Sequence, residues 1–447
     1  MIAELRRRAM LISRNVYVQR AFFIGIFALV CTTLVISTRA ATPAAGVEAE
    51  SGVIAGGATV VSVPGQSGSG VVKFGGGATS TLNLLPEVGI NFQAGWSNGL
   101  HTDADNRAII DNIASQGMKW VRIDIGWSTI EEAGDIYGGS SDSTAIYPSE
   151  ASNNWYIKKI DNAVNYANSK GIKVIGIWWT TPSWNTDGGS GKVSTTRPAG
   201  YPQYSEYAES ASWAAKYWEG RIDNWEVWNE ADPLQSFWQA PDGSYGGTQY
   251  YAELLKAAYP AIKNANPNAK VLTSGASSVD VQWINQLYGY GIKNYFDIMA
   301  IHTYEGLANN DPLNSDGSQT WNFLHVPTLR QLMVDNNDSS KPIWITEMGY
   351  STHANSDLTG DGVVKNWNLG VTEQQQGDYL VKAIDYAKKN WPYLEVFIVY
   401  NDKDRASASG DAETQRQQMN FGIMYTDNNP KPALSIIGSY LQANTAN

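Results

Sequence analysis

The sequence is short of the residues that hold metal ions and cross-link chains. Cys31 is the only cysteine among 447 residues, so no intrachain disulfide forms and a cysteine-based metal site is excluded. The histidines show no paired ligand spacing, so no zinc site is expected; they are His101, His302, His325 and His353. The stretch 356–367, SDLTGDGVVKNW, hints at a calcium loop, but its acidic spacing fails. We therefore predict no bound metal.

Charged residues are also scarce, at 17% of the chain, and the net charge is −11. The first 40 residues hold six arginines and a single acid, Glu4, so the rest of the chain is more acidic than the total indicates. An acidic body argues against nucleic-acid binding, which needs basic patches to contact phosphate. Neutral partners fit this charge balance better.

An uncharged run follows the arginine-rich start of the chain. Residues 21–38, AFFIGIFALVCTTLVIST, carry no charge and are just long enough to span a bilayer. This pattern is typical of a secretory signal peptide or an uncleaved signal anchor. We assign residues 1–38 to a cytoplasmic basic segment plus signal peptide or signal anchor. The protein is expected to be secreted or membrane-anchored and to act outside the cytoplasm.

Residues 39–83 are rich in Gly, Ser and Ala. They resemble the opening strands of a β-sandwich carbohydrate-binding module, but such a sandwich needs about 100 residues. We interpret this segment as a spacer or a carbohydrate-binding-module remnant, with no binding role assigned.

Residues 84–447 alternate short apolar or β-branched runs with amphipathic stretches that end at Gly, Asn or Pro. The runs read as strands buried on both faces, as parallel strands are. Eight are expected, at 88–93, 119–127, 173–180, 221–229, 270–276, 296–304, 341–349 and 394–401. Thr102 with Asp105, and Thr372, are expected to cap two of the intervening helices.

Eight β/α units in about 360 residues match the number and size of an α/β protein of the (β/α)8 TIM-barrel class. A doubly wound open sheet is the competing fold, but the glycine-rich phosphate loop that usually accompanies it is missing. We therefore predict a TIM barrel, with its functional groups at the C-terminal ends of the strands.

That rule selects the residues of a site. Glu230 follows the fourth predicted strand, and Glu347 ends the seventh. Two carboxylates facing each other across a barrel mouth are what glycosidic-bond cleavage needs: one donates a proton to the leaving oxygen, and the other attacks the anomeric carbon or activates a water. This chemistry needs no cofactor.

Two stretches carry a resemblance to known enzymes. WEVWNE at 225–230 and WITEMGY at 344–350 strongly resemble the retaining clan A glycoside hydrolases, closest to family 39 and the family 5 cellulase-like β-glycosidases. The similarity runs along residues 84–447 through four further pieces in matching order: GINF at 89–92, KWVRIDIGWSTIE at 119–131, FDIMAIHTY at 296–304 and NFGIMYTDNNPKPA at 420–433.

The resemblance implies that Glu230 is the acid/base and Glu347 the nucleophile of a retaining enzyme. It implies that Asn229 holds the sugar 2-hydroxyl and that Arg122 keeps the nucleophile ionised. The other candidate substrate-binding residues are His302 and Tyr304 at the point of cleavage, and the aromatic side chains Trp179, Trp184 and Tyr400.

Three details of this part of the sequence can be decided only by the structure. Asn229 shares the face of Glu230 only if the strand ends or bulges there. Glu226 is expected to be a buried structural partner of Arg122. Relatives usually have Pro after the acid/base Glu, where this chain has Ala231, and many have Trp where it has Tyr400.

Other readings of the barrel stay open at this stage. A cell-surface barrel could bind glycan without cleaving it, and an inverting hydrolase or a transglycosylase could share the architecture. We expect a monomer that acts on a polysaccharide or oligosaccharide, and that contacts the membrane only through an uncleaved anchor. The sugar, its linkage and the choice of endo or exo attack depend on loop shapes that the sequence does not give.

Overall fold

The computed structural model describes residues 59–61, 71–73, 86–96, 99–131, 154–233, 237–244, 247–306, 308–355, 369–408 and 412–445. The chain divides into two compact units, Met1–Asn83 and Leu84–Asn447. Residues 1–38, with the expected signal or anchor, lie outside the described ranges. No helix among the residues described is both long and apolar enough to cross a bilayer.

The first unit contains one antiparallel strand pair among its described residues. Strand β1 (Thr59–Val61) pairs with β2 (Val71–Lys73), and Val60 faces Val72. The interpretation of residues 39–83 as a spacer or module remnant stays a prediction.

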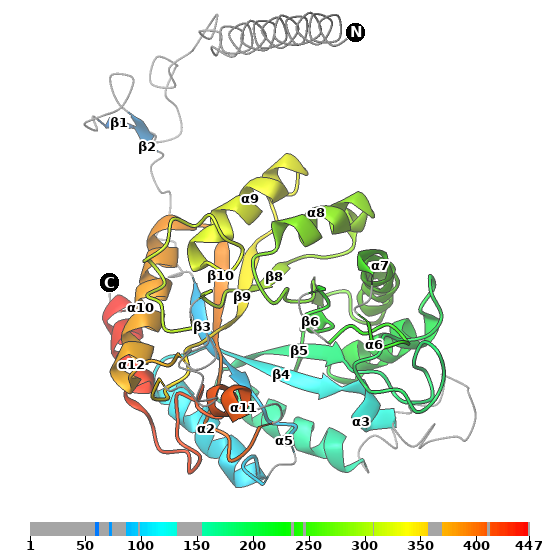
Figure 1. Cartoon of the computed structure of the whole chain (residues 1–447), viewed down its shortest axis with the longest axis horizontal. Coiled ribbons are helices and arrows are strands. Elements are labelled where there is room, and N and C mark those ends of the chain that lie inside the picture. Colours follow the sequence, from blue (N-terminus) through cyan, green and yellow to red (C-terminus); the bar gives the residue numbers. More distant parts are fainter. Residues whose placement is uncertain are drawn as a thin grey trace, which may run out of the picture. The chain divides into compact units, whose positions relative to one another are not determined.

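The second unit is built on eight parallel strands, and every strand predicted from the sequence is present (Figure 1). Their order around the sheet is β7-β6-β5-β4-β3-β10-β9-β8. Backbone bonds such as Thr273 N to Ile298 O (3.1 Å) join the β7 side to the β8 side and nearly close the ring. The strands are β3 (Glu87–Phe92), β4 (Trp120–Gly126), β5 (Lys173–Trp179), β6 (Asn224–Val227), β7 (Lys270–Leu272), β8 (Met299–His302), β9 (Ile343–Met348) and β10 (Leu394–Val399). The predicted (β/α)8 barrel is confirmed.

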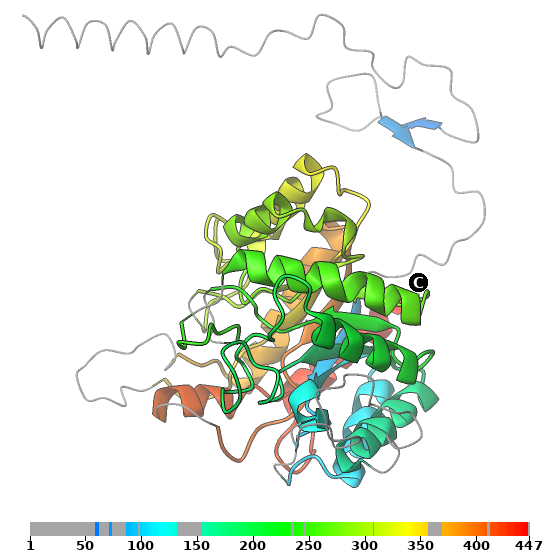
Figure 2. The ribbon, with the colours of Figure 1, turned by 90° about the vertical axis from the view of Figure 1, so that its right-hand side faces the viewer.

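Helices surround the strands, as Figure 1 shows, and Figure 2 turns the molecule so that α6 and α7 face the viewer. Thr102 and Thr372 both form capping boxes at helix starts, as the sequence predicts. The α-helices are α2 (Asp103–Ser115), α3 (Trp127–Glu131), α5 (Trp155–Ser169), α6 (Ser205–Tyr217), α7 (Thr248–Ala265), α8 (Val281–Gly289), α9 (Val326–Asp335), α10 (Glu373–Asn390), α11 (Ala412–Gln418) and α12 (Pro432–Thr445), with 3-10 turns η3 (Ile292–Asn294) and η4 (Phe323–His325).

The barrel interior is a packed core and holds no pore. Trp120 and Trp344 meet edge to face with centroids 5.0 Å apart, within a buried cluster drawn from β4, β5, β7, β8, β9 and β10. Because side chains alternate along a strand, Arg122 faces inward two residues above Trp120. This apolar cluster therefore lies beneath Arg122, and the polar groups of the site lie above it.

Candidate active site

The end of β6 has a backbone conformation that sequence alternation alone does not give. Trp228 and Glu230 both have positive φ, at 71° and 44°, a conformation that non-glycine residues adopt rarely. The turn is held by two hydrogen bonds, from Glu230 N to Gly275 O (3.1 Å) and from Ala231 N to Ser274 Oγ (2.9 Å). The expected strand end at Asn229 is thus present.

The end of β9 is irregular as well. Its pairing with β8 shifts register between Ile301–Ile345 and His302–Glu347, so Thr346 is the extra residue of a bulge. Bulges re-aim side chains near active sites. Here the bulge places Glu347 opposite His302.

Three side chains hold the Glu347 carboxylate. Arg122 Nη1 donates to its Oε1 at 2.6 Å, Asn91 Nδ2 donates to the same oxygen at 3.0 Å, and the Tyr304 hydroxyl donates to Oε2 at 2.7 Å. Donors on both oxygens favour the charged form and fix the orientation of the carboxylate.

Arg122 is fully buried and connects the two strand ends. Its guanidinium forms a bidentate pair with Glu226, with Nε–Oε2 at 2.7 Å and Nη2–Oε1 at 2.9 Å, and Nη2 also donates to Asn229 Oδ1 at 2.8 Å. Glu226 is therefore the buried partner of Arg122 that the sequence predicts. Since Asn229 uses its oxygen here, its amide N–H groups are directed elsewhere, and no protein acceptor is found for them among the described residues.

Glu230 is paired with His302. The His302 Nδ1 lies 2.7 Å from Glu230 Oε1, and the Nε2 lies 3.5 Å from Arg122 Nη2. Despite burial, Glu347 and Glu230 raise the pKa of His302, which favours a proton on the ring, and a proton on Nδ1 is donated to Glu230. Glu230 thus keeps its second oxygen available for a proton of its own.

The two carboxylates lie close together in the barrel mouth. Glu230, His302 and Glu347 each offer an atom within 4.8 Å of the other two. These three groups are therefore where a cation could bind in the described part of the chain. A metal would have to replace hydrogen bonds already made, including that of Tyr304 to Glu347.

The surroundings push the pKa values of the two glutamates apart. Burial raises the pKa of Glu230 to about 7, against the hydrogen bond from His302, and the charge of Glu347 adds to the rise. Burial also works to raise the pKa of Glu347, but His302, Arg122 and the Tyr304 hydroxyl outweigh it and leave that pKa below its ordinary value. At neutral pH one carboxyl group is poised to carry a proton while its neighbour is ionised.

The predicted aromatic residues make mainly protein contacts. Trp179, partly buried at the end of β5, packs edge-on against Trp228 with centroids 6.5 Å apart. Trp184 donates from Nε1 to Glu131 O at 2.9 Å. Tyr400 packs edge to face against Tyr304, which donates to Glu347, with ring centroids 6.1 Å apart.

Several residues at the mouth are missed by reasoning from the sequence. Asn91 lies within the GINF piece, and its position inside a buried strand was the available signal. Asp124 follows Arg122 at the spacing of one strand face. Trp96 and Arg405 lie in loops after β3 and β10, and no local pattern marks them.

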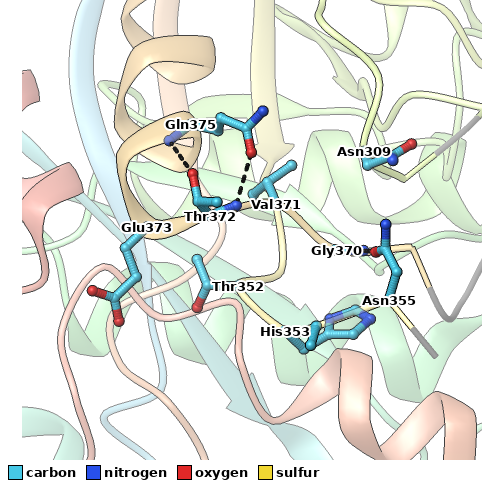
Figure 3. A pocket seen from close by; sticks show the side chains of 10 residues that line it. Asn309, Thr352, His353, Asn355, Gly370, Val371, Thr372, Glu373 and Gln375 are labelled. Carbon is cyan, nitrogen blue, oxygen red and sulfur yellow. Dashed lines mark hydrogen bonds between the residues drawn. The ribbon is translucent and has the colours of Figure 1, made fainter.

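A separate hollow of about 480 Å³ lies in the loops after β8 and β9. Its lining is mostly polar and includes Asn309, His353, Asn355 and Glu373 (Figure 3). None of the predicted site residues lines it. The stretch 356–367, considered above as a calcium loop, falls outside the described residues.

Comparison with known proteins gives one family match. A profile described as Cellulase (glycosyl hydrolase family 5) matches residues 83–392, which is more than half of the chain. No curated protein matches the sequence.

Solved structures similar to this chain include glycoside hydrolases. A family 39 enzyme from the gut symbiont Bacteroides cellulosilyticus WH2 has 20% identity and a TM-score of 0.57 over 80% of this chain and 64% of that chain. A family 39 β-xylosidase from Caulobacter crescentus has 16% identity and a TM-score of 0.54, over 80% and 71%. A family 5 subfamily 18 protein from Streptomyces cattleya, in complex with GlcNAc, has 14% identity and a TM-score of 0.55, over 80% of each chain. This chain thus spans less than two thirds of the Bacteroides enzyme, and at these identities the structures share its fold.

Proposed function

Because the chain belongs to glycosyl hydrolase family 5, the cellulase family of the retaining clan A, and is an enzyme that hydrolyses O-glycosyl bonds, we propose that it is a β-glycosidase acting by double displacement. The family membership confirms the resemblance predicted from the sequence. The observation that carries the two-glutamate mechanism is that one carboxylate oxygen of Glu230 and one of Glu347 lie within 4.8 Å of each other, with opposite pKa shifts. Carboxyl groups about 5–5.5 Å apart suit retention, while inversion needs about 6.5–9.5 Å.

In the first step, the Glu347 carboxylate attacks the anomeric carbon. Protonated Glu230 donates its proton to the glycosidic oxygen as the bond to the leaving group breaks. The products are a glycosyl ester on Glu347 and a free alcohol.

In the second step, Glu230 acts as a base. Esterification removes the charge of Glu347, which is one cause of the raised pKa of Glu230, so that pKa falls after the first step. The carboxylate of Glu230 then takes a proton from water, the water oxygen attacks the anomeric carbon, and Glu347 leaves.

The neighbouring residues support this cycle. Arg122 and Tyr304 hold Glu347 ionised and oriented, and His302 orients Glu230. The amide N–H groups of Asn229, next to Glu230, suit a sugar 2-hydroxyl. Aromatic surface for sugar rings is supplied by those parts of Trp179, Trp184 and Tyr400 that are not packed against other side chains.

The substrate is proposed to be a β-linked polysaccharide or oligosaccharide. A screen of xylan, mannan, β-glucan and aryl β-glycosides, followed by proton NMR of the first-formed product, tests this directly. We expect the β-anomer to appear first; an α-anomer would refute the mechanism. Glycan binding without turnover by the wild type would instead favour a non-catalytic barrel, and transfer to added acceptor sugars would favour a transglycosylase.

The proposed place of action is outside the cytoplasm, with release or anchoring decided by residues 21–38. Their uncharged sequence behind an arginine-rich start supports export. Fractionation of cells that produce the full chain tests it, and activity found only in the cytoplasm would refute it.

A further inference from the structure

Arg405 is a partly buried guanidinium with unusual partners. Its Nη2 donates to the Tyr400 hydroxyl at 2.5 Å, and its Cζ lies 4.4 Å above the centre of the Trp96 ring. With the Gln93 amide oxygen turned toward it, Arg405 Nε donates to that oxygen at 3.2 Å. Within the described ranges, no carboxylate forms an ion pair with this guanidinium.

Asp124, on β4, also contacts Trp96. Its carboxylate accepts a hydrogen bond from the Trp96 side chain, and burial raises its pKa to about 6, with Arg122 opposing and Glu347 adding to the rise. It lies on the face of β4 that carries Arg122, so it is directed into the mouth near Glu347. Trp96 therefore contacts both a guanidinium and a carboxylate, and the double-displacement mechanism uses neither of these charged groups.

The order of strands decides which part of the substrate these groups would meet. Trp96, Asp124 and Arg405 follow or belong to β3, β4 and β10, which are consecutive in the sheet, and β10 is next to β9, which carries Glu347. Glu230 belongs to the end of β6, beyond β5. The leaving group must lie beside Glu230, so the sugar attacked by Glu347 extends toward the β3-β4-β10 side.

We propose that Trp96, Asp124 and Arg405 form a glycone wall that selects the sugar attacked by Glu347, and that this sugar is a neutral pyranose. The inference rests on the proposed function. Asp124 accepts hydrogen bonds from sugar hydroxyls, while Arg405 and the Tyr400 hydroxyl donate to sugar oxygens. Neutral sugars need both kinds of partner, whereas Asp124 beside Glu347 would repel the carboxylate of an acidic sugar.

Aryl β-glycosides that share one leaving group and differ only in the glycone test the wall. The probes are the 4-nitrophenyl glucoside, xyloside, galactoside, mannoside and glucuronide. For the best neutral glycone, Arg405→Gln and Asp124→Asn should each lower kcat/KM by about tenfold, which is about 1.4 kcal/mol, chiefly through KM. Poorer glycones should lose less, so the preference among sugars flattens.

The matched control is Arg107→Gln on the outer helix α2. It removes a guanidinium that lies 5.1 Å above the ring of Tyr166 on α5. It should leave the preference unchanged. An equal loss on every glycone together with a lower melting temperature would make the wall merely structural and overturn the proposal. A wild-type preference for the glucuronide that Arg405→Gln abolishes would also overturn it.

Failure of the proposed function gives a different result. If the wild type cleaves no glycoside, that function fails, and the wall is judged by calorimetric binding of the free monosaccharides. Weaker binding to Arg405→Gln than to wild type supports the wall, and equal binding overturns it.

Discussion

Glu230 and Glu347 are the same residue type and both are buried, but their different neighbours shift their pKa values in opposite directions. The pKa of Glu347 is lowered, so its contribution is present above that pKa and is lost as the pH falls through it. The pKa of Glu230 is raised to about 7, so its acid function is present below that value and is lost as the pH rises through it. In the proposed mechanism, the difference in role comes mainly from Arg122 and Tyr304, which donate hydrogen bonds to Glu347.

The pH profile of kcat/KM should be bell-shaped, with an alkaline limb near pH 7 and an acidic limb below pH 4.5, the ordinary pKa of a glutamate. Tyr304→Phe removes a hydrogen bond that lowers the pKa of Glu347, so the acidic limb should move to higher pH. Tyr166→Phe removes a similar bond to Asp111 on the surface and should leave the profile unchanged. Identical acidic limbs in wild type and Tyr304→Phe would contradict this account.

The loss of activity on replacing Glu230 should grow with the basicity of the leaving group. Glu230→Gln should lower kcat by about 10²–10⁴-fold on glycosides with a poor leaving group. On a dinitrophenyl glycoside, which needs no proton for the first step, kcat/KM should fall far less, whereas kcat should still fall because the second step has lost its base. Steady-state kinetics on a leaving-group series measures this, and a loss independent of leaving-group basicity would remove Glu230 from the acid role.

At the scale of an element, the end of β6 explains Ala231, where relatives usually have Pro. The Ala231 N–H donates to Ser274 Oγ, and a proline has no N–H to donate. Proline also disfavours positive φ in the residue before it, whereas Glu230 has φ of 44°. The structure thus needs a residue with an N–H at this position.

Ser274→Ala should lower the free energy of unfolding by about 1–3 kcal/mol, because it leaves a buried N–H without a partner. Ala231→Pro should cost more and should also lower kcat, since it changes the backbone that aims Glu230. Denaturant unfolding and steady-state kinetics on both variants test this. A proline variant as stable and active as wild type would refute the explanation.

Features set by local sequence patterns can be predicted from the sequence, whereas features set by contacts between distant residues cannot. Periodicity and helix caps are local, so the eight strands and the capping boxes at Thr102 and Thr372 could be predicted. The pair Arg122–Glu226 also follows, because buried charges need partners. Arg405 could not be found, since its partners lie far away in the chain or in loops, and Asn91 offered only the signal of a polar residue inside a buried strand. The register shift that aims Glu347 likewise depends on the pairing of β8 with β9.

At the scale of the whole molecule, the barrel does not end where the family match ends. The match stops at residue 392, but β10 pairs with both β3 and β9. A chain ending at Trp391 would leave the edges of β3 and β9 unpaired, so it should fail to fold. The unit Leu84–Asn447 should keep the melting temperature and the kcat of the full chain on soluble glycosides. Calorimetry and kinetics of both truncations check this, and a folded, active chain ending at Trp391 would contradict it.

The central claim is that Glu347 becomes covalently bonded to the sugar during turnover. Incubation with a 2-deoxy-2-fluoro β-glycoside that has a good leaving group, followed by peptide mapping with mass spectrometry, tests it most directly. We predict one added fluorosugar per chain, located on Glu347 in the peptide that contains WITEMGY, with matching loss of activity. Labelling at another residue, or an unlabelled chain after a fluorosugar substrate is turned over, would contradict the account.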